Sequence, residues 1–211
     1  MSHSPLDDST SESSAAYRSG WKEIVNLISN GGSWSGHERN CVFLNTGQER
    51  FADVSAVSGL DFDDDGRAIA SADWDHDGDI DLWLSNRTGP RLRFVRNESR
   101  GENGFLAVRL IGTCCNRDAI GARLELETGG RTLRQTLHAG DGYLAQSSKW
   151  TVFGLGPEGT PDTLVVRWPG GDAERFTELK QNSRYHLIQG TGTAERDEAQ
   201  PRATTLKPER L

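Results

Sequence analysis

The feature that most constrains this 211-residue chain is a series of short segments, beginning after Gly32, in which apolar and polar residues alternate. Glycine, asparagine, aspartate and proline separate the segments. A period of two places alternate side chains on opposite faces of a strand, so the pattern predicts a mainly β protein. We expect strands at residues 41–44, 68–72, 81–85, 92–96, 105–111, 122–127, 133–138, 150–153, 163–168, 174–178 and 185–189.

The last seven of these segments follow one another closely, with turn sequences such as Thr128-Gly129-Gly130 between them. Short strands at this spacing are typical of a β-sandwich, which we place at residues 104–190. The polar run NESRGENG ends at the start of this region and predicts a domain boundary. The earlier strands then form a separate β-unit at residues 33–100.

One segment has the period of a helix instead. Tyr17, Trp21, Ile24, Val25 and Ile28 fall on one helical face, and Asn30-Gly31-Gly32 is a stop signal. We therefore predict an amphipathic helix at residues 15–32. Residues 1–14 and 191–211 are polar, with little to bury, and we expect them to be disordered tails.

Composition excludes several classes of protein. The net charge of −7 does not suit a general nucleic-acid binder, which needs a basic surface to neutralise phosphates. No apolar run approaches the roughly 18 to 20 residues that span a bilayer, so we expect no membrane insertion. The three cysteines, Cys41, Cys114 and Cys115, form neither a disulfide framework nor a C-x-x-C metal or redox motif.

The stretch DWDHDGDIDL places five aspartates at alternate positions: Asp73, Asp75, Asp77, Asp79 and Asp81. A Ca²⁺ ion accepts six to eight oxygen ligands and replaces the mutual repulsion of carboxylates with attraction. Gly78 at position six permits a tight turn, which would point the backbone carbonyl of Asp79 inward. The spacing therefore predicts a calcium loop.

The flanks of this loop have strand-like alternation, and the twelfth position, which is glutamate in an EF-hand, is Leu84. A calcium loop inside a β-hairpin fits better, with Ile80 and Leu82 pointing into the core. The alternative is a solvated acidic turn. A second run, Asp61, Asp63 and Asp65, predicts a hairpin turn or additional ligands for the first site.

Other polar groups lie in glycine-rich loops at the ends of predicted strands. Asp141, Tyr143, Gln146 and Ser147 fall in AGDGYLAQSS, and Asp118 falls in NRDAIGA. Such loops often bind ligands, and these side chains could hold a sugar, while local turn chemistry is the simpler interpretation. The chain has neither H-E-x-x-H nor a G-x-S-x-G elbow, and we expect it not to be an enzyme.

Two regions resemble known families. The motif D-x-D-x-D-G-x-x-D with its flanks resembles the FG-GAP-type repeat of β-propeller proteins. The motifs NRDAIGA, AGDGYLAQSS, FGLG and VRWPGG, in that order, resemble the ASPIC/UnbV domain that commonly follows such repeats, as in the cartilage acidic protein 1-like family. Together the resemblances cover roughly residues 34–190.

The resemblance implies one propeller-blade-like unit with calcium on the five aspartates, no catalytic residue, and a binding or adhesion role outside the cytoplasm. We therefore expect a periplasmic or secreted protein; the N-terminus MSHSPLDDSTSESS shows no signal peptide, and a cytoplasmic location is the alternative. We expect a calcium-stabilised binding or assembly module with a protein partner, as a homo-oligomer or part of a larger assembly. The alternative is a carbohydrate-active protein, a lectin or a glycoside hydrolase, that uses the loops at Asp118 and Asp141 to bind a glycan.

Overall fold

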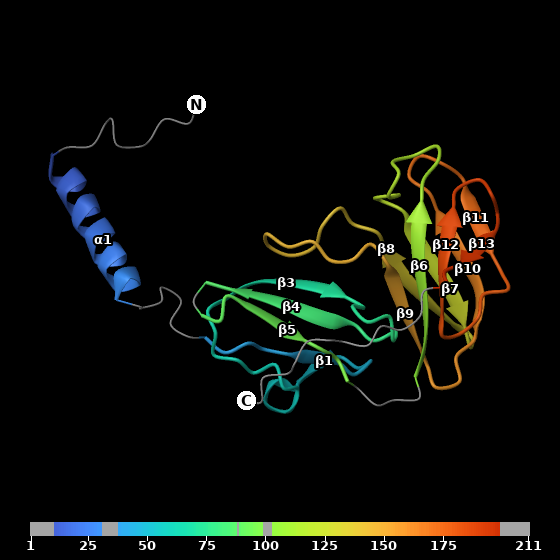
Figure 1. Cartoon of the computed structure of the whole chain (residues 1–211), viewed down its shortest axis with the longest axis horizontal. Helices are drawn as coiled ribbons and strands as arrows, with labels where there is room; N and C mark the ends of the chain where they lie inside the picture. Colours follow the sequence, from blue (N-terminus) through green and yellow to red (C-terminus); the bar gives the residue numbers. More distant parts are fainter. Residues whose placement is uncertain (1–10, 31–37, 88, 99–102, 199–211) are drawn as a thin grey trace. The chain divides into compact units, whose positions relative to one another are not determined.

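The computed structural model of the chain describes residues 11–30, 38–87, 89–98 and 103–198 (Figure 1). Within these residues the only α-helix is α1, Ser11–Ser29, and the other regular elements are strands and one 3₁₀ turn. The mainly β prediction is therefore confirmed. Within the same residues no helix is long and apolar enough to cross a membrane.

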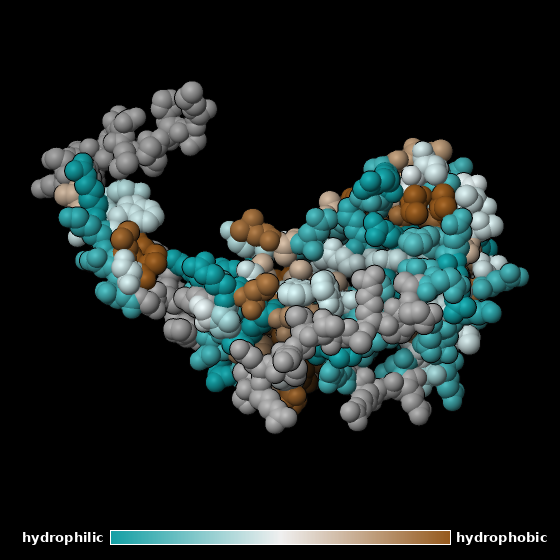
Figure 2. Space-filling view, viewed as in Figure 1, coloured by the Kyte–Doolittle hydropathy of each residue, from teal (hydrophilic) through white to brown (hydrophobic). Residues whose placement is uncertain are grey.

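Helix α1 begins four residues before the predicted start, inside the segment expected to be a tail, and residues 31–32 lie outside the described part. Its predicted apolar stripe exists but remains largely exposed: Tyr17, Trp21 and Val25 are each about half exposed. Figure 2 shows hydrophobic side chains on the surface of this helix. The helical period was thus predicted correctly, and no described neighbour covers the stripe.

The chain divides into two compact units. One comprises Met1–Arg67 with Ser85–Leu92, and the other comprises Ala68–Leu84 with Arg93–Leu211. In the first unit, β1 (Phe43–Asn45) pairs antiparallel with β2 (Phe51–Asp53), and a 3₁₀ turn, η1, follows at Ser55–Val57. The strand predicted at residues 41–44 corresponds to β1, and strand β2 was not predicted.

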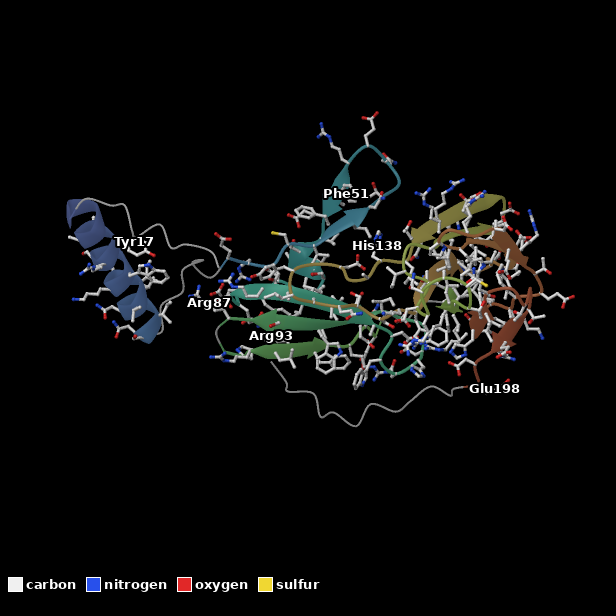
Figure 3. The ribbon with its side chains drawn as sticks, turned by 90° about the horizontal axis from the view of Figure 1, so that it is seen from above. Tyr17, Phe51, Arg87, Arg93, His138 and Glu198 are labelled. Carbon is white, nitrogen blue, oxygen red and sulfur yellow. The ribbon has the colours of Figure 1, made fainter. Side chains whose placement is uncertain are left out.

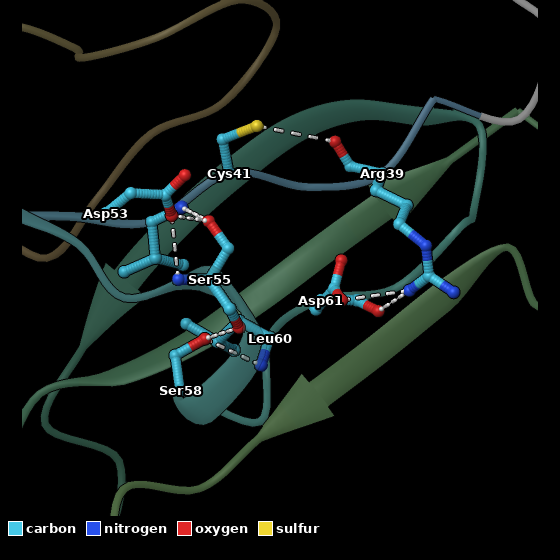
Figure 4. A network of polar contacts seen from close by, with 8 residues as sticks. Arg39, Cys41, Asp53, Ser55, Ser58, Leu60 and Asp61 are labelled. Carbon is cyan, nitrogen blue, oxygen red and sulfur yellow. Dashed lines mark hydrogen bonds and ion pairs between the residues drawn. The ribbon is translucent and has the colours of Figure 1, made fainter.

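A polar network fastens the segments around this hairpin (Figure 4). The Ser55 hydroxyl donates to Asp53 Oδ1 at 2.6 Å and accepts a hydrogen bond from the backbone N–H of Val42 at 2.9 Å. The Arg39 guanidinium pairs with Asp61 Oδ2 at 3.0 Å. Asp65, at the end of the second acidic run, pairs with Arg67 at 2.8 Å. Asp61 and Asp65 thus pair with arginines of this part of the chain, and residues 61–65 form no hairpin turn.

A three-stranded sheet of order β3-β4-β5 follows, with β3 at Gly66–Ala72, β4 at Asp81–Asn86 and β5 at Leu92–Val95. The run of aspartates connects β3 to β4. The side chains of Trp74, Trp83 and Phe94 contact one another beside this connection, with ring centroids 4.6 to 6.1 Å apart. Aromatic contacts of this kind stabilise a small sheet beyond the area that they bury.

The remaining strands form two four-stranded sheets, of order β11-β10-β7-β8 and β13-β12-β6-β9 (Figure 1). All neighbours pair antiparallel except β12 and β6, which are parallel, with Tyr185 opposite Val108. Strand β13 lies inside the segment 191–211 that was expected to be disordered. The bounds are β6 Gly104–Ile111, β7 Arg123–Thr128, β8 Arg131–Thr136, β9 Thr151–Gly156, β10 Pro161–Arg167, β11 Ala173–Phe176, β12 Ser183–Ile188 and β13 Ala194–Arg196.

Both sheets contribute side chains to one hydrophobic core. The residues predicted to share one face, Leu106, Val108 and Leu110, are all buried there. Ala107 is also fully buried, so the middle of β6 is covered on both faces. The other core side chains include Leu124, Leu126, Phe153, Leu155, Leu164, Val166, Trp168, Phe176 and Leu187.

Candidate metal centre

The connection from β3 to β4 gathers three of the five aspartates. Carboxylate oxygens of Asp73, Asp75 and Asp77 all lie within 4.8 Å of one another. Asp73 and Asp75 are buried, while the Asp77 side chain is 34% exposed. Asp61, Asp63 and Asp65 form no such group among the described residues. The structure therefore singles out the run with the complete calcium-loop spacing.

The loop can converge because the backbone turns sharply at its centre. Gly78 has φ +97°, and His76 has φ +64°, both in the left-handed region that favours glycine. A Cβ added to Gly78 would meet the ring of Phe105, which fills that space. Two separate constraints therefore require glycine at position six: the backbone conformation, and the close approach of Phe105 from β6.

The last two predicted ligands lie outside the group of three. Asp81 is fully buried, and its carboxylate accepts backbone hydrogen bonds from Trp74 at 2.9 Å and Asn97 at 2.8 Å. The backbone N–H of Asp79 donates to Asp77 Oδ1 at 3.0 Å. In this structure Asp81 braces the loop, and Asp79 orients Asp77.

The prediction that Ile80 and Leu82 point into the core was wrong. Ile80 is 37% exposed and Leu82 is only half-buried, whereas Asp81 and Leu84 are buried. The loop inverts the expected alternation because Asp81 turns inward to accept two backbone N–H groups, which a buried carboxylate requires.

Two arginines from outside the loop contact the three carboxylates. The Arg184 guanidinium, which extends from β12, donates to Asp73 Oδ2 at 2.8 Å; the two side chains are 5% and 1% exposed. It also lies over the ring of Trp150, 4.1 Å from its centroid. Arg96, just after β5, pairs through Nε with Asp75 Oδ2 at 2.8 Å. These contacts place positive charge beside the acidic loop.

The loop nevertheless resists ionisation. Burial raises the pKa of Asp73, although the charge of Arg184 opposes this effect. Burial also raises the pKa of Asp77 and of Asp79, and neighbouring aspartates raise both further. For Asp73, Asp77 and Asp79, the effect of burial on the pKa is therefore larger than any opposing effect of the two arginines.

The residues fit a hard divalent cation. Three carboxylates provide oxygen ligands of the type that Ca²⁺ prefers. Asp73 Oδ1 is buried and has no hydrogen-bond partner of normal geometry among the described residues, although the N–H groups of Gly78 and His76 face the carboxylate. A cavity of about 460 Å³, lined in part by Asp77, Asn182 and Arg196, gives an ion a route to the loop.

Two residues of the C-terminal loops that were predicted to bind a ligand, Asp118 and Ser147, make contacts within the protein instead. Asp118 pairs with Lys149 at 2.7 Å, and this hydrogen bond holds the pKa of the Asp118 carboxyl below its usual value. The Ser147 hydroxyl accepts a hydrogen bond from the backbone of Ser71 in β3 at 3.2 Å, and the backbone of Ser148 donates to Ser71 at 2.9 Å. Both interactions connect neighbouring segments within one unit.

Some of these loop residues line a smaller cavity of about 220 Å³ between β8 and β9. Asp141 and Ser147 are part of its wall, together with Gln135, His138 and Trp150. His138 follows β8 and is labelled in Figure 3. Tyr143 and Gln146 are exposed and are not among the lining residues.

Sequence reasoning missed Arg96, Arg184 and Gln189. The Gln189 side-chain oxygen accepts hydrogen bonds from the backbone N–H groups of residues 113, 114 and 115 at 3.0 to 3.2 Å. Arg184 and Asp73 are 111 residues apart, so no local motif links them. The only signal in the sequence was that a cluster of carboxylates needs positive charge from somewhere.

Comparison with known proteins places one part of the chain. Residues 112–194 match the family model "ASPIC and UnbV", which confirms that resemblance for this region. The matched residues include Asp118, Asp141, Ser147 and Arg184 but not the acidic loop. No curated protein sequence matches the chain.

Proposed function

We propose that this protein is a calcium-binding β protein that acts without catalysis as a binding, adhesion or assembly module. The observation that carries the proposal is the group formed by Asp73, Asp75 and Asp77 at the predicted positions one, three and five of the loop. The remaining proposed ligands are the backbone carbonyl of Asp79 and the carboxylate of Asp81, which would have to exchange its backbone hydrogen bonds for the ion.

In this proposal the ion works as a structural clamp. Without the ion, burial and, to a smaller extent, repulsion between neighbouring aspartates disfavour the charged carboxylates, and both effects raise the pKa values of Asp77 and Asp79. Calcium would supply the missing positive charge and fix the connection between β3 and β4. Because Arg184 and Phe105 contact the same loop, the clamp would also hold the loop against the C-terminal sheets.

We further propose finer assignments for the two β regions. Residues 33–100 are an FG-GAP-type, propeller-blade-like repeat, and residues 104–190 are a β-sandwich, as in the cartilage acidic protein 1-like family. The loop spacing supports the first assignment, and the core shared by two four-stranded sheets supports the second. Such a protein suits an extracytoplasmic location, where millimolar calcium fills a weak site.

The test is a thermal melt of metal-stripped protein with and without millimolar Ca²⁺. At about 100 times its dissociation constant, calcium should add roughly 2.7 kcal/mol, or on the order of 5 to 10 °C. The double variant Asp75→Ala, Asp77→Ala should lose this shift. The control is Asp162→Ala, Asp172→Ala, which removes the same charge from exposed positions outside the loop. Equal shifts in all three proteins, or none, would refute the proposed site.

The cavity beside Trp150 supports a second candidate, a lectin or glycoside hydrolase. Asp141, His138 and Gln135 line this cavity and offer hydrogen bonds to a sugar. Titration with glucose, galactose and mannose tests it by saturation-transfer NMR. Binding that is lost in Asp141→Ala and retained in Tyr143→Ala, whose side chain lies outside the cavity, would favour this candidate.

A further inference from the structure

Arg96 is placed where a cation would bind. Its Nε lies 2.8 Å from Asp75 Oδ2, and its Nη2 lies 3.8 Å from Asp77 Oδ2. One guanidinium thus contacts two of the three clustered carboxylates. The guanidinium in this position neutralises the same carboxylate oxygens that a divalent ion would use as ligands. The guanidinium and the ion therefore compete for these oxygens.

Arg96 also has another position available. Its side chain is 37% exposed, and its Nη1 already lies 3.3 Å from Glu98 Oε1, whose side chain is 71% exposed. Release from the loop therefore leaves the guanidinium in water and paired with Glu98. The Asp75 side chain is only 3% exposed, so it needs a counter-charge at all times, and an arriving divalent ion would supply that charge as Arg96 leaves.

Arg184 behaves differently. Its guanidinium is buried against Trp150 and contacts Asp73 through Oδ2, leaving Oδ1 of the same carboxylate buried and without a normal hydrogen bond. Arg184 can keep its contact while Oδ1 ligates an ion, as carboxylates at metal sites commonly do. The three carboxylates and two guanidiniums leave one net negative charge, and release of Arg96 would raise that to two.

We propose that Arg96 is an affinity-determining residue of the metal loop: its guanidinium holds Asp75 and Asp77 together in the metal-free protein, and Ca²⁺ displaces it. The inference rests on the proposed calcium site. Arg96 then competes with calcium for Asp75 and Asp77, and removing the arginine should tighten calcium binding.

The experiment is a calorimetric titration of the metal-stripped full chain with CaCl₂. Arg96→Gln should lower the apparent Kd about fivefold, because the ion no longer has to displace a charge. Arg96→Lys retains the charge but cannot contact both carboxylates at once, so its Kd should lie between those of the parent and Arg96→Gln. Arg134→Gln on β8 removes an exposed ion pair with Glu125 of β7 and is the matched control, expected to leave Kd unchanged.

A melt of the same proteins provides a second readout. Without calcium, Arg96→Gln should melt about 2 to 4 °C below the parent, because Asp75 and Asp77 lose their counter-charge. If the parent binds calcium and Arg96→Gln binds it equally or more weakly, the displacement role is wrong while the calcium site stands. If Arg96→Gln binds calcium and the parent does not, the displacement role of Arg96 is supported. If no variant binds calcium, the proposed function fails and this inference fails with it.

Discussion

At the scale of single residues, the acidic loop titrates unusually. Burial raises the pKa values of Asp73, Asp77 and Asp79 above their ordinary value of 3.8. A protonated carboxyl is a poor ligand, so protons and calcium compete for the loop. In the metal-free protein, the ionisation of these groups opposes folding: that destabilisation is absent below pH 3.8 and grows as pH rises through the raised pKa values.

Calcium binding should therefore weaken as the loop becomes protonated. We expect the apparent Kd to rise as the pH falls through the raised pKa values towards 3.8, and binding in that range to release protons. Calorimetry in two buffers with different ionisation enthalpies measures both quantities. A Kd that does not change with pH, with no proton release, would show that these carboxyls do not take up protons in the metal-free protein.

The sequence predicted the contacts of the acidic loop that join residues close together in the chain. The spacing D-x-D-x-D-G predicted that the first three carboxylates converge, because a glycine at position six permits the turn. The inward turn of Asp81 was not predictable, since its partner Asn97 belongs to a different strand end. Arg96 and Arg184 were missed for the same reason.

At the scale of elements, long alternating segments were predictable and short ones were not. Strands β6, β7, β10 and β12 lie close to their expected bounds because each has a buried face. Strands β2 and β13 have three residues each and depend on pairing that the sequence does not reveal. The loop after β6 is a further case, because its conformation depends on Gln189, which follows β12.

Replacing Gln189 with alanine should destabilise that loop. The change leaves three backbone N–H groups without their shared acceptor, and we expect a loss of about 1 to 3 kcal/mol in the free energy of unfolding. Urea denaturation measures it. Gln189→Glu retains the acceptor oxygen and should cost less, and Gln135→Ala, which removes one exposed bond to Val152, is the control. Equal stability of Gln189→Ala and Gln135→Ala would contradict this role.

At the scale of the whole molecule, the acidic loop belongs to the same compact unit as the two four-stranded sheets. Asp73 contacts Arg184 of β12, Gly78 packs on Phe105 of β6, and Ser71 pairs with residues 147 and 148. An ion bound at the loop would therefore stabilise strands that do not touch it, because binding to the folded state is shared by the whole cooperative unit.

Hydrogen exchange tests this coupling. Calcium should slow amide exchange in β12 and β6 as well as in the loop, while β1 and β2, which belong to the other unit, should change little. Mass spectrometry of peptic fragments resolves these regions. Protection confined to residues 73–81 would show that the clamp is only local.

The ion pair between Asp73 and Arg184 also has a consequence for the order in which the chain is made. A ribosome that has added Asp73 must add 111 more residues to reach Arg184. Until then the buried position of Asp73 has no protein counter-charge, and closing so long a loop is slow. During that interval Arg96 is already present to pair with Asp75 and Asp77, so Asp73 is the carboxylate of the three that waits longest for its arginine, and a free cation can occupy it in the meantime.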